Sequence, residues 1–248
     1  MKLSSKRPYI GISMGDPVGI GPEILVKALN YSKVYTLCKP LIIGDSQVIQ
    51  QALKLLKFRH NIHIITDPDQ GKYKFNTLDI MNISNINIDC SSLLGPTFET
   101  GTAMQDYIIK GIDLALTNRI SGIVTCPITK TALKLAGSQF HGHTELLAHR
   151  TKTKDYAMML SGKKLKVILV TIHIPLSQVV PSLTTEDIIG KIKLTHTSLK
   201  NRFNIKAPKI AVAGLHPHAG EASMFGPEEE DIIAPAVRHS KKKGINVK

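Results

Sequence analysis

The sequence predicts an α/β protein built on a mostly parallel sheet. Apolar stretches of strand length alternate along the chain with amphipathic stretches of helical length, which is the rhythm of β-α-β units. Several of the apolar stretches lack polar alternation, as is typical of parallel strands that are covered on both faces. Hydrophobic residues make up 42% of the 248 residues, so the chain can bury a sizeable core.

The individual elements follow from hydrophobic periodicity and from turn residues. We expect strands at residues 9–14, 41–43, 61–65, 122–125, 165–172 and 209–215. We expect helices at residues 22–29, 46–56, 101–117, 145–149 with their flanks, 185–201 and 227–243. The polar residues 67–75 are expected to form a surface loop. Residues 245–248 look like the start of a further strand, so we expect the chain to be truncated.

Composition excludes several classes of protein. Cys38, Cys90 and Cys126 are odd in number and form no CxxC pattern, which argues against a disulfide scaffold or a cysteine zinc site. The sequence has no apolar run long enough to span a membrane and no secretory signal pattern. We therefore expect a reduced, cytoplasmic protein. The charge of +13 comes from dispersed basic residues without interleaved aromatic residues, so it favours an anionic small molecule over nucleic acid.

Four loops at expected strand ends carry polar residues, and ligands of open α/β sheets bind at that edge. The first loop contains Asp16 between Gly15 and Gly19, and it opens a helix. Its glycines do not match the GxGxxG fingerprint, so it is either an anion-binding turn or an ordinary tight turn. The second loop leads into Lys130, which could pair with a phosphate or carboxylate but could equally be solvated.

The third loop holds His141, His143 and Thr144 just before an expected helix. A histidine in such a turn suits substrate binding or proton transfer, whereas Thr144 could merely cap the helix. The fourth feature is a pair of histidines, His173 and His218, each just beyond an apolar strand. If those strands are neighbours, the two imidazoles converge and could bind a divalent metal; otherwise each is a hydrogen-bonded loop residue.

The same loops resemble the motifs of the 4-hydroxythreonine-4-phosphate dehydrogenase family of vitamin B6 biosynthesis. The resemblance spans essentially the whole chain, and GHTE together with GLxPHAGE is specific. The matching segments are Met14–Glu23 (MGDPVGIGPE), Thr125–Lys130 (TCPITK), Phe140–Leu147 (FHGHTELL), Thr171–Leu176 (TIHIPL), Gly214–Glu221 (GLHPHAGE) and Gly226–Asp231 (GPEEED).

The resemblance implies one chain folded into two interwoven α/β/α lobes, similar to isocitrate and isopropylmalate dehydrogenases, with the site in a cleft. It implies a homodimer that uses NAD or NADP and a divalent metal such as zinc, magnesium or cobalt. His173 and His218 match two of three metal histidines, whereas His216 stands where the family commonly has Asn and is not carried over as a ligand. His143 and Thr144 match substrate-binding positions, and Asp16 and Lys130 lie in motifs that line the cleft.

The implied reaction is the oxidation and decarboxylation of 4-phosphohydroxy-L-threonine to 3-amino-2-oxopropyl phosphate. Family members continue beyond the point equivalent to Lys248, and that part carries the third metal histidine and further catalytic residues. We therefore expect a chain that ends at Lys248 to bind metal weakly and to turn over poorly or not at all. The alternatives are a dehydrogenase of another four-carbon phosphorylated acid, such as erythronate 4-phosphate, and an inactive remnant.

Overall fold

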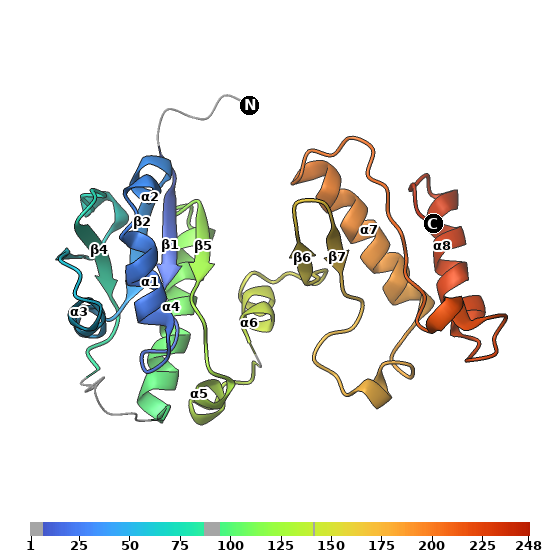
Figure 1. The fold of residues 1–248 in the computed structure, drawn as a ribbon, viewed down its shortest axis with the longest axis horizontal. Coiled ribbons are helices and arrows are strands. Elements are labelled where there is room, and N and C mark those ends of the chain that lie inside the picture. Colours follow the sequence, from blue (N-terminus) through green and yellow to red (C-terminus); the bar gives the residue numbers. More distant parts are fainter. Residues whose placement is uncertain (1–6, 87–94, 141) are drawn as a thin grey trace. The chain divides into compact units, whose positions relative to one another are not determined.

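The structure is a computed structural model that describes residues 7–86, 95–140 and 142–248. The chain divides into two units, Met1–Lys152 and Thr153–Lys248 (Figure 1). The arrangement of the two units around a common cleft stays a prediction. In the described residues, no helix is long and apolar enough to cross a membrane.

The first unit is organised around a five-stranded parallel sheet with the order β3-β4-β2-β1-β5. Its strands are β1 (Tyr9–Ser13), β2 (Lys39–Gly44), β3 (Asn61–Ile65), β4 (Thr77–Asn82) and β5 (Gly122–Thr125). The central strand β2 buries Leu41, Ile42 and Ile43 completely, as expected for a strand covered on both faces. Because all strands are parallel, their carboxyl ends lie at one edge, where the loops with polar residues begin.

In the described part of this unit, six α-helices accompany the sheet. They are α1 (Gly21–Leu29), α2 (Ser32–Leu37), α3 (Ser46–Leu55), α4 (Phe98–Leu116), α5 (Lys130–Leu135) and α6 (His143–Arg150). The longest, α4, packs on β1, β2 and β5. It begins at a capping box in which the Thr100 amide donates to Oγ1 of Thr97 at 3.2 Å and the Thr97 amide donates to Oγ1 of Thr100 at 2.9 Å.

Strand β4 was not predicted, because the polar Asp79 interrupts its apolar pattern. Asp79 is nevertheless buried, since its carboxylate accepts the amides of Lys72 at 2.9 Å and Tyr73 at 2.7 Å and lies 2.7 Å from Nδ1 of His63. The expected surface loop at residues 67–75 is also partly wrong. It contains a short 3-10 helix, η1 (Pro68–Gln70), and it buries Tyr73, whose hydroxyl donates to the carbonyl of Pro68 at 2.5 Å.

The second unit has far less sheet. It contains β6 (Met159–Ser161), β7 (Lys166–Ile168), the 3-10 helices η2 (Leu176–Gln178) and η3 (Pro217–Gly220), α7 (Thr185–Asn201), the π-helix η4 (Glu229–Ile233) and α8 (Ala234–Lys242). The prediction of a long buried strand at 165–172 is wrong. Only β7 forms there, it pairs antiparallel with β6, and Leu165 remains 69% exposed.

The expected strand at 209–215 is reduced to one parallel bridge, Ile210 to Val247. The Val212 amide donates to the Lys248 carbonyl at 2.8 Å and the Lys248 amide donates to the Ile210 carbonyl at 3.0 Å, so the expected extended segment at 245–248 does form. A groove of about 430 Å³ lies over α7, between β7 and residues 209–213. These strands are short because, within the described residues, they have few neighbouring strands to pair with.

Candidate functional site

Asp16 lies in the loop between β1 and α1, at the carboxyl edge of the sheet. Its side chain is 2% exposed, and Oδ1 accepts the Val18 amide at 3.1 Å. The Asp16 amide donates to the carbonyl of Pro127 at 3.1 Å, so this loop is joined to the loop that follows β5. Gly15 makes the approach possible: its φ is +79°, and a Cβ there would lie 2.3 Å from the Pro127 carbonyl oxygen.

Lys130 is the first residue of α5, directly after the loop that Asp16 contacts. Its side chain is exposed, so the ammonium group is available to an anionic ligand. The structure thus brings the Asp16 loop and the Lys130 loop together at one edge of the first unit, as the parallel strands predicted. The role of either side chain in binding stays a prediction.

His143 begins helix α6 and is half-buried. Its Nε2 is shielded from solvent and finds no hydrogen-bond partner in the part of the chain that is described. Burial lowers the pKa of His143, because an imidazolium would lose its hydration there. A neutral ring with an unpaired buried nitrogen suits hydrogen bonding to a polar ligand.

Thr144 follows within the first turn of α6, and the N-cap is Gly142, without a side-chain cap hydrogen bond. The alternative that Thr144 caps this helix is therefore wrong. His141, from the same motif, lies outside the described residues. Helix α6 is held against α4 by Leu146, Ile108 and Ile112, so an apolar contact fixes the position from which His143 projects.

His173 and His218 both lie in the second unit, on exposed and left-handed backbone. Their φ angles are +57° and +53°, respectively, a region that non-glycine residues rarely adopt. The His218 ring is 79% exposed, and its Nδ1 lies 3.2 Å from Oε2 of Glu221. Each histidine follows an apolar segment as expected, but their convergence on a metal stays a prediction.

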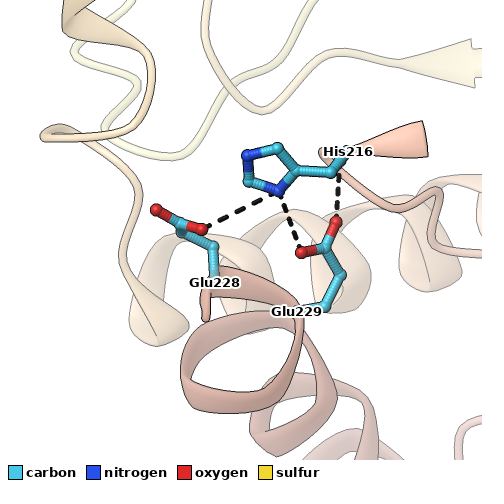
Figure 2. Close-up of side chains that lie close together, drawn as sticks. All are labelled: His216, Glu228 and Glu229. Carbon is cyan, nitrogen blue, oxygen red and sulfur yellow. Dashed lines mark hydrogen bonds and ion pairs between the residues drawn. The ribbon is translucent and has the colours of Figure 1, made fainter. Parts of the chain in front are cut away.

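A cluster that the sequence did not predict lies next to His218. His216, Glu228 and Glu229 place ligand-type atoms within 4.8 Å of one another, and no other such group of three occurs among the residues described (Figure 2). Nδ1 of His216 is 3.1 Å from Oε2 of Glu229 and 3.8 Å from Oε2 of Glu228. The sequence shows these carboxylates in the acidic segment 226–231, but only the fold places them next to His216.

The Glu229 carboxylate is already fully engaged within the chain. Its Oε1 accepts the amides of Leu215 at 2.8 Å and His216 at 2.7 Å, and Oε2 faces the His216 ring. These hydrogen bonds, above all the one from the His216 amide, lower the pKa of Glu229 to about 2. The Glu229 carboxylate thus holds the backbone at Leu215 and His216, whereas Oε2 of Glu228 is buried without a hydrogen-bond partner among the described residues.

Comparison with known proteins shows the family to which the chain belongs. Residues 36–248 match the family described as "Pyridoxal phosphate biosynthetic protein PdxA". A 4-hydroxythreonine-4-phosphate dehydrogenase from Desulforapulum autotrophicum is 53% identical over 247 residues, which are 99% of this chain and 72% of that protein. The chain belongs to the PdxA family.

Other relatives agree with PdxA membership. The crystal structure of 4-hydroxythreonine-4-phosphate dehydrogenase from Klebsiella pneumoniae superposes with a TM-score of 0.85 at 37% identity, covering 99% of this chain and 74% of that one. A Clostridium botulinum protein provisionally named D-threonate 4-phosphate dehydrogenase is 36% identical over 99% of this chain and 73% of its own length. The PdxA relatives confirm the predicted α/β fold class and the prediction of a dehydrogenase family.

Proposed function

We propose that this chain catalyses the oxidation and decarboxylation of 4-phosphohydroxy-L-threonine to 3-amino-2-oxopropyl phosphate in pyridoxal phosphate biosynthesis. The observation that carries the proposal is the 53% identity to a 4-hydroxythreonine-4-phosphate dehydrogenase over nearly the whole chain. The match includes the loops at the strand ends, which are where an α/β fold binds its ligands. We propose NAD or NADP as the hydride acceptor and the cytoplasm as the location, both on the basis of the family resemblance.

The first unit supplies groups for the substrate. The buried Nε2 of His143, which has no partner among the described residues, can form a hydrogen bond with a substrate heteroatom, and burial lowers the pKa of this ring and so favours its neutral form. Thr144 adds a hydroxyl group in the same helical turn. Lys130 offers an exposed cation for the phosphate or carboxylate of the substrate, on a loop that Asp16 and Pro127 hold in place.

The second unit supplies groups for the metal. His173 and His218 are exposed imidazoles, which are preferred donors for zinc and cobalt. The contact between His218 Nδ1 and Glu221 fits this role, because a ring that donates Nδ1–H to a carboxylate presents the lone pair of Nε2 to a metal. A bound divalent cation would act as a Lewis acid toward the substrate oxygen atoms, and the nicotinamide would accept the hydride.

The family resemblance also supports a homodimer. Multi-angle light scattering of the purified chain tests this part, and a molar mass that corresponds to one chain at all concentrations would contradict it.

The reaction itself is tested by following NADH. Purified chain is supplied with NAD, one of zinc, magnesium or cobalt, and 4-phosphohydroxy-L-threonine. In parallel reactions, D-threonate 4-phosphate and erythronate 4-phosphate replace that substrate. We expect NADH with the first acid and at least about tenfold less with the others, since a hydroxyl group in place of the C2 ammonium group changes the charge and the hydrogen bonds at that carbon. A preference for D-threonate 4-phosphate or erythronate 4-phosphate would overturn the proposed substrate.

The metal residues are tested separately by equilibrium dialysis with zinc. His173→Ala and His218→Ala should each weaken zinc binding by about tenfold or more and abolish metal-dependent turnover. His239→Ala is the matched control, because His239 is an exposed histidine of the same unit on α8. Zinc affinity and turnover at the wild-type level in His173→Ala or His218→Ala would contradict the metal assignment.

A further inference from the structure

The segment that carries His218 has an unusual backbone. Six consecutive residues have positive φ angles: His218 (+53°), Ala219 (+53°), Gly220 (+80°), Glu221 (+44°), Ala222 (+56°) and Ser223 (+65°). Left-handed backbone is unfavourable for every L-residue, because Cβ approaches the following carbonyl oxygen. Only one of the six is glycine, so contacts outside the segment must stabilise it. We refer to residues 218–223 as the left-handed turn.

One side chain that contacts the backbone around this turn is Glu229, at the start of the helical segment that leads into α8. Its Oε1 binds the backbone just before the turn, through the amides of Leu215 and His216 at 2.8 and 2.7 Å. The Glu229 side chain is only 11% exposed, so these charge-assisted hydrogen bonds are largely shielded from water.

The backbone of the left-handed turn also lies close to the Glu229 carboxylate. A Cβ at Gly220 would lie 2.8 Å from Oε2 of Glu229, and a Cβ at Gly214 would lie 3.3 Å from Oε1. Glycine at these two positions allows the backbone on both sides of His218 to approach the same two oxygen atoms. His216 completes the enclosure, since its Nδ1 lies 3.1 Å from Oε2 (Figure 2).

We propose that Glu229 is a positioning residue for His218. It holds residues 215 and 216 before the left-handed turn, and it lies against Gly220 within the turn, so the backbone of His218 has a fixed course between two supported points. The metal part of this inference rests on the proposed function, in which His218 is a ligand. The support of the turn by Glu229 does not depend on it.

The test compares Glu229→Ala and Glu229→Gln with Glu230→Ala. Glu230 is the exposed neighbour of Glu229 in the same helical segment, so it controls for the loss of one acidic side chain. Amide hydrogen exchange at Leu215 and His216 reports on the support itself, and zinc affinity reports on its consequence for His218. Circular dichroism of each variant establishes that the helices are retained.

Glu229→Ala should raise amide exchange at Leu215 and His216 by about tenfold or more and weaken zinc binding to a similar extent, because charge-assisted hydrogen bonds are lost. Glu229→Gln should lie between Glu229→Ala and wild type, since its amide oxygen can still accept both N–H groups. Glu230→Ala should match wild type. If Glu229→Ala does not fold, the same amides are measured in Glu229→Gln, where the expected increase is smaller but in the same direction.

Wild-type exchange at both amides in the folded Glu229 variants would overturn the inference. Fast exchange in Glu229→Ala, combined with zinc affinity that His218→Ala leaves unchanged, would support the role of Glu229 in the turn. It would at the same time overturn the metal assignment of the proposed function. The two failures are therefore distinguishable.

Discussion

The two units of the chain hold their candidate site residues in different ways. In the first unit, a fully buried parallel strand, β2, lies at the centre of an apolar core, and the loops with Asp16 and Lys130 follow from strand order. In the second unit, the core that surrounds α7 and α8 is small; its buried members are Ile188, Ile192, Ala236 and Val247. The segment with His218 is shaped by the hydrogen bonds of Glu229 instead. Apolar burial positions the candidate residues of the first unit, and a single carboxylate contacts the backbone on both sides of His218 in the second.

The largest expected effect on stability comes from shortening one buried side chain in the core of each unit. Ile42→Ala, at a completely buried position of β2, should reduce the free energy of unfolding by about 4 kcal/mol, because the close-packed sheet cannot collapse into the cavity. Ile192→Ala borders the open groove over α7 and should cost about 2 kcal/mol, since its neighbours can relax. Hydrogen exchange of peptides from β1 and α7 assigns each loss to its unit. Equal losses would show that the two cores are packed alike.

A smaller effect is expected from two glycines of the first unit. Gly15→Ala should destabilise by about 3 kcal/mol, because φ is positive and the new Cβ would lie 2.3 Å from the Pro127 carbonyl oxygen. Gly137→Ala is the matched control: φ is +69°, but nothing lies within 4 Å, so we expect a loss of only about 1 kcal/mol. Urea unfolding measures both. If Gly15→Ala lowers the free energy of unfolding no more than Gly137→Ala does, the close contact between the loops that follow β1 and β5 does not contribute to stability.

The smallest effect concerns the titration of His143. Its ring should titrate below the usual midpoint of about 6.5, because burial disfavours the charged form. The stabilisation due to the neutral ring is complete above the unfolded-state pKa of about 6.5 and is lost as the pH falls through the lower folded-state pKa. Imidazole NMR signals, compared between the native chain and the chain in urea, measure this. A native midpoint at or above that of the unfolded chain would show that the first unit leaves His143 solvated.

The local sequence was sufficient to predict an element wherever the hydrophobic pattern of that segment alone determines its structure. Strands 61–65 and 122–125 and helix 185–201 form with the predicted bounds, because alternation, turn residues and apolar spacing all lie within the segment. Strand β4 was missed, since the burial of Asp79 is tolerated only through hydrogen bonds from His63, Lys72 and Tyr73. Those partners cannot be inferred from the residues beside Asp79.

The sequence by itself determined the α/β class, the family motifs and the order in which the loops follow the strands. It did so because these features depend on hydrophobic period and on residues that are adjacent in the chain. Only the tertiary structure decided that Glu229 contacts the backbone on both sides of His218 and that Nε2 of His143 is buried with no partner among the residues that the structure describes. Both depend on contacts between segments that are distant in sequence, or on solvent exclusion, and neither leaves a periodic signal in the chain.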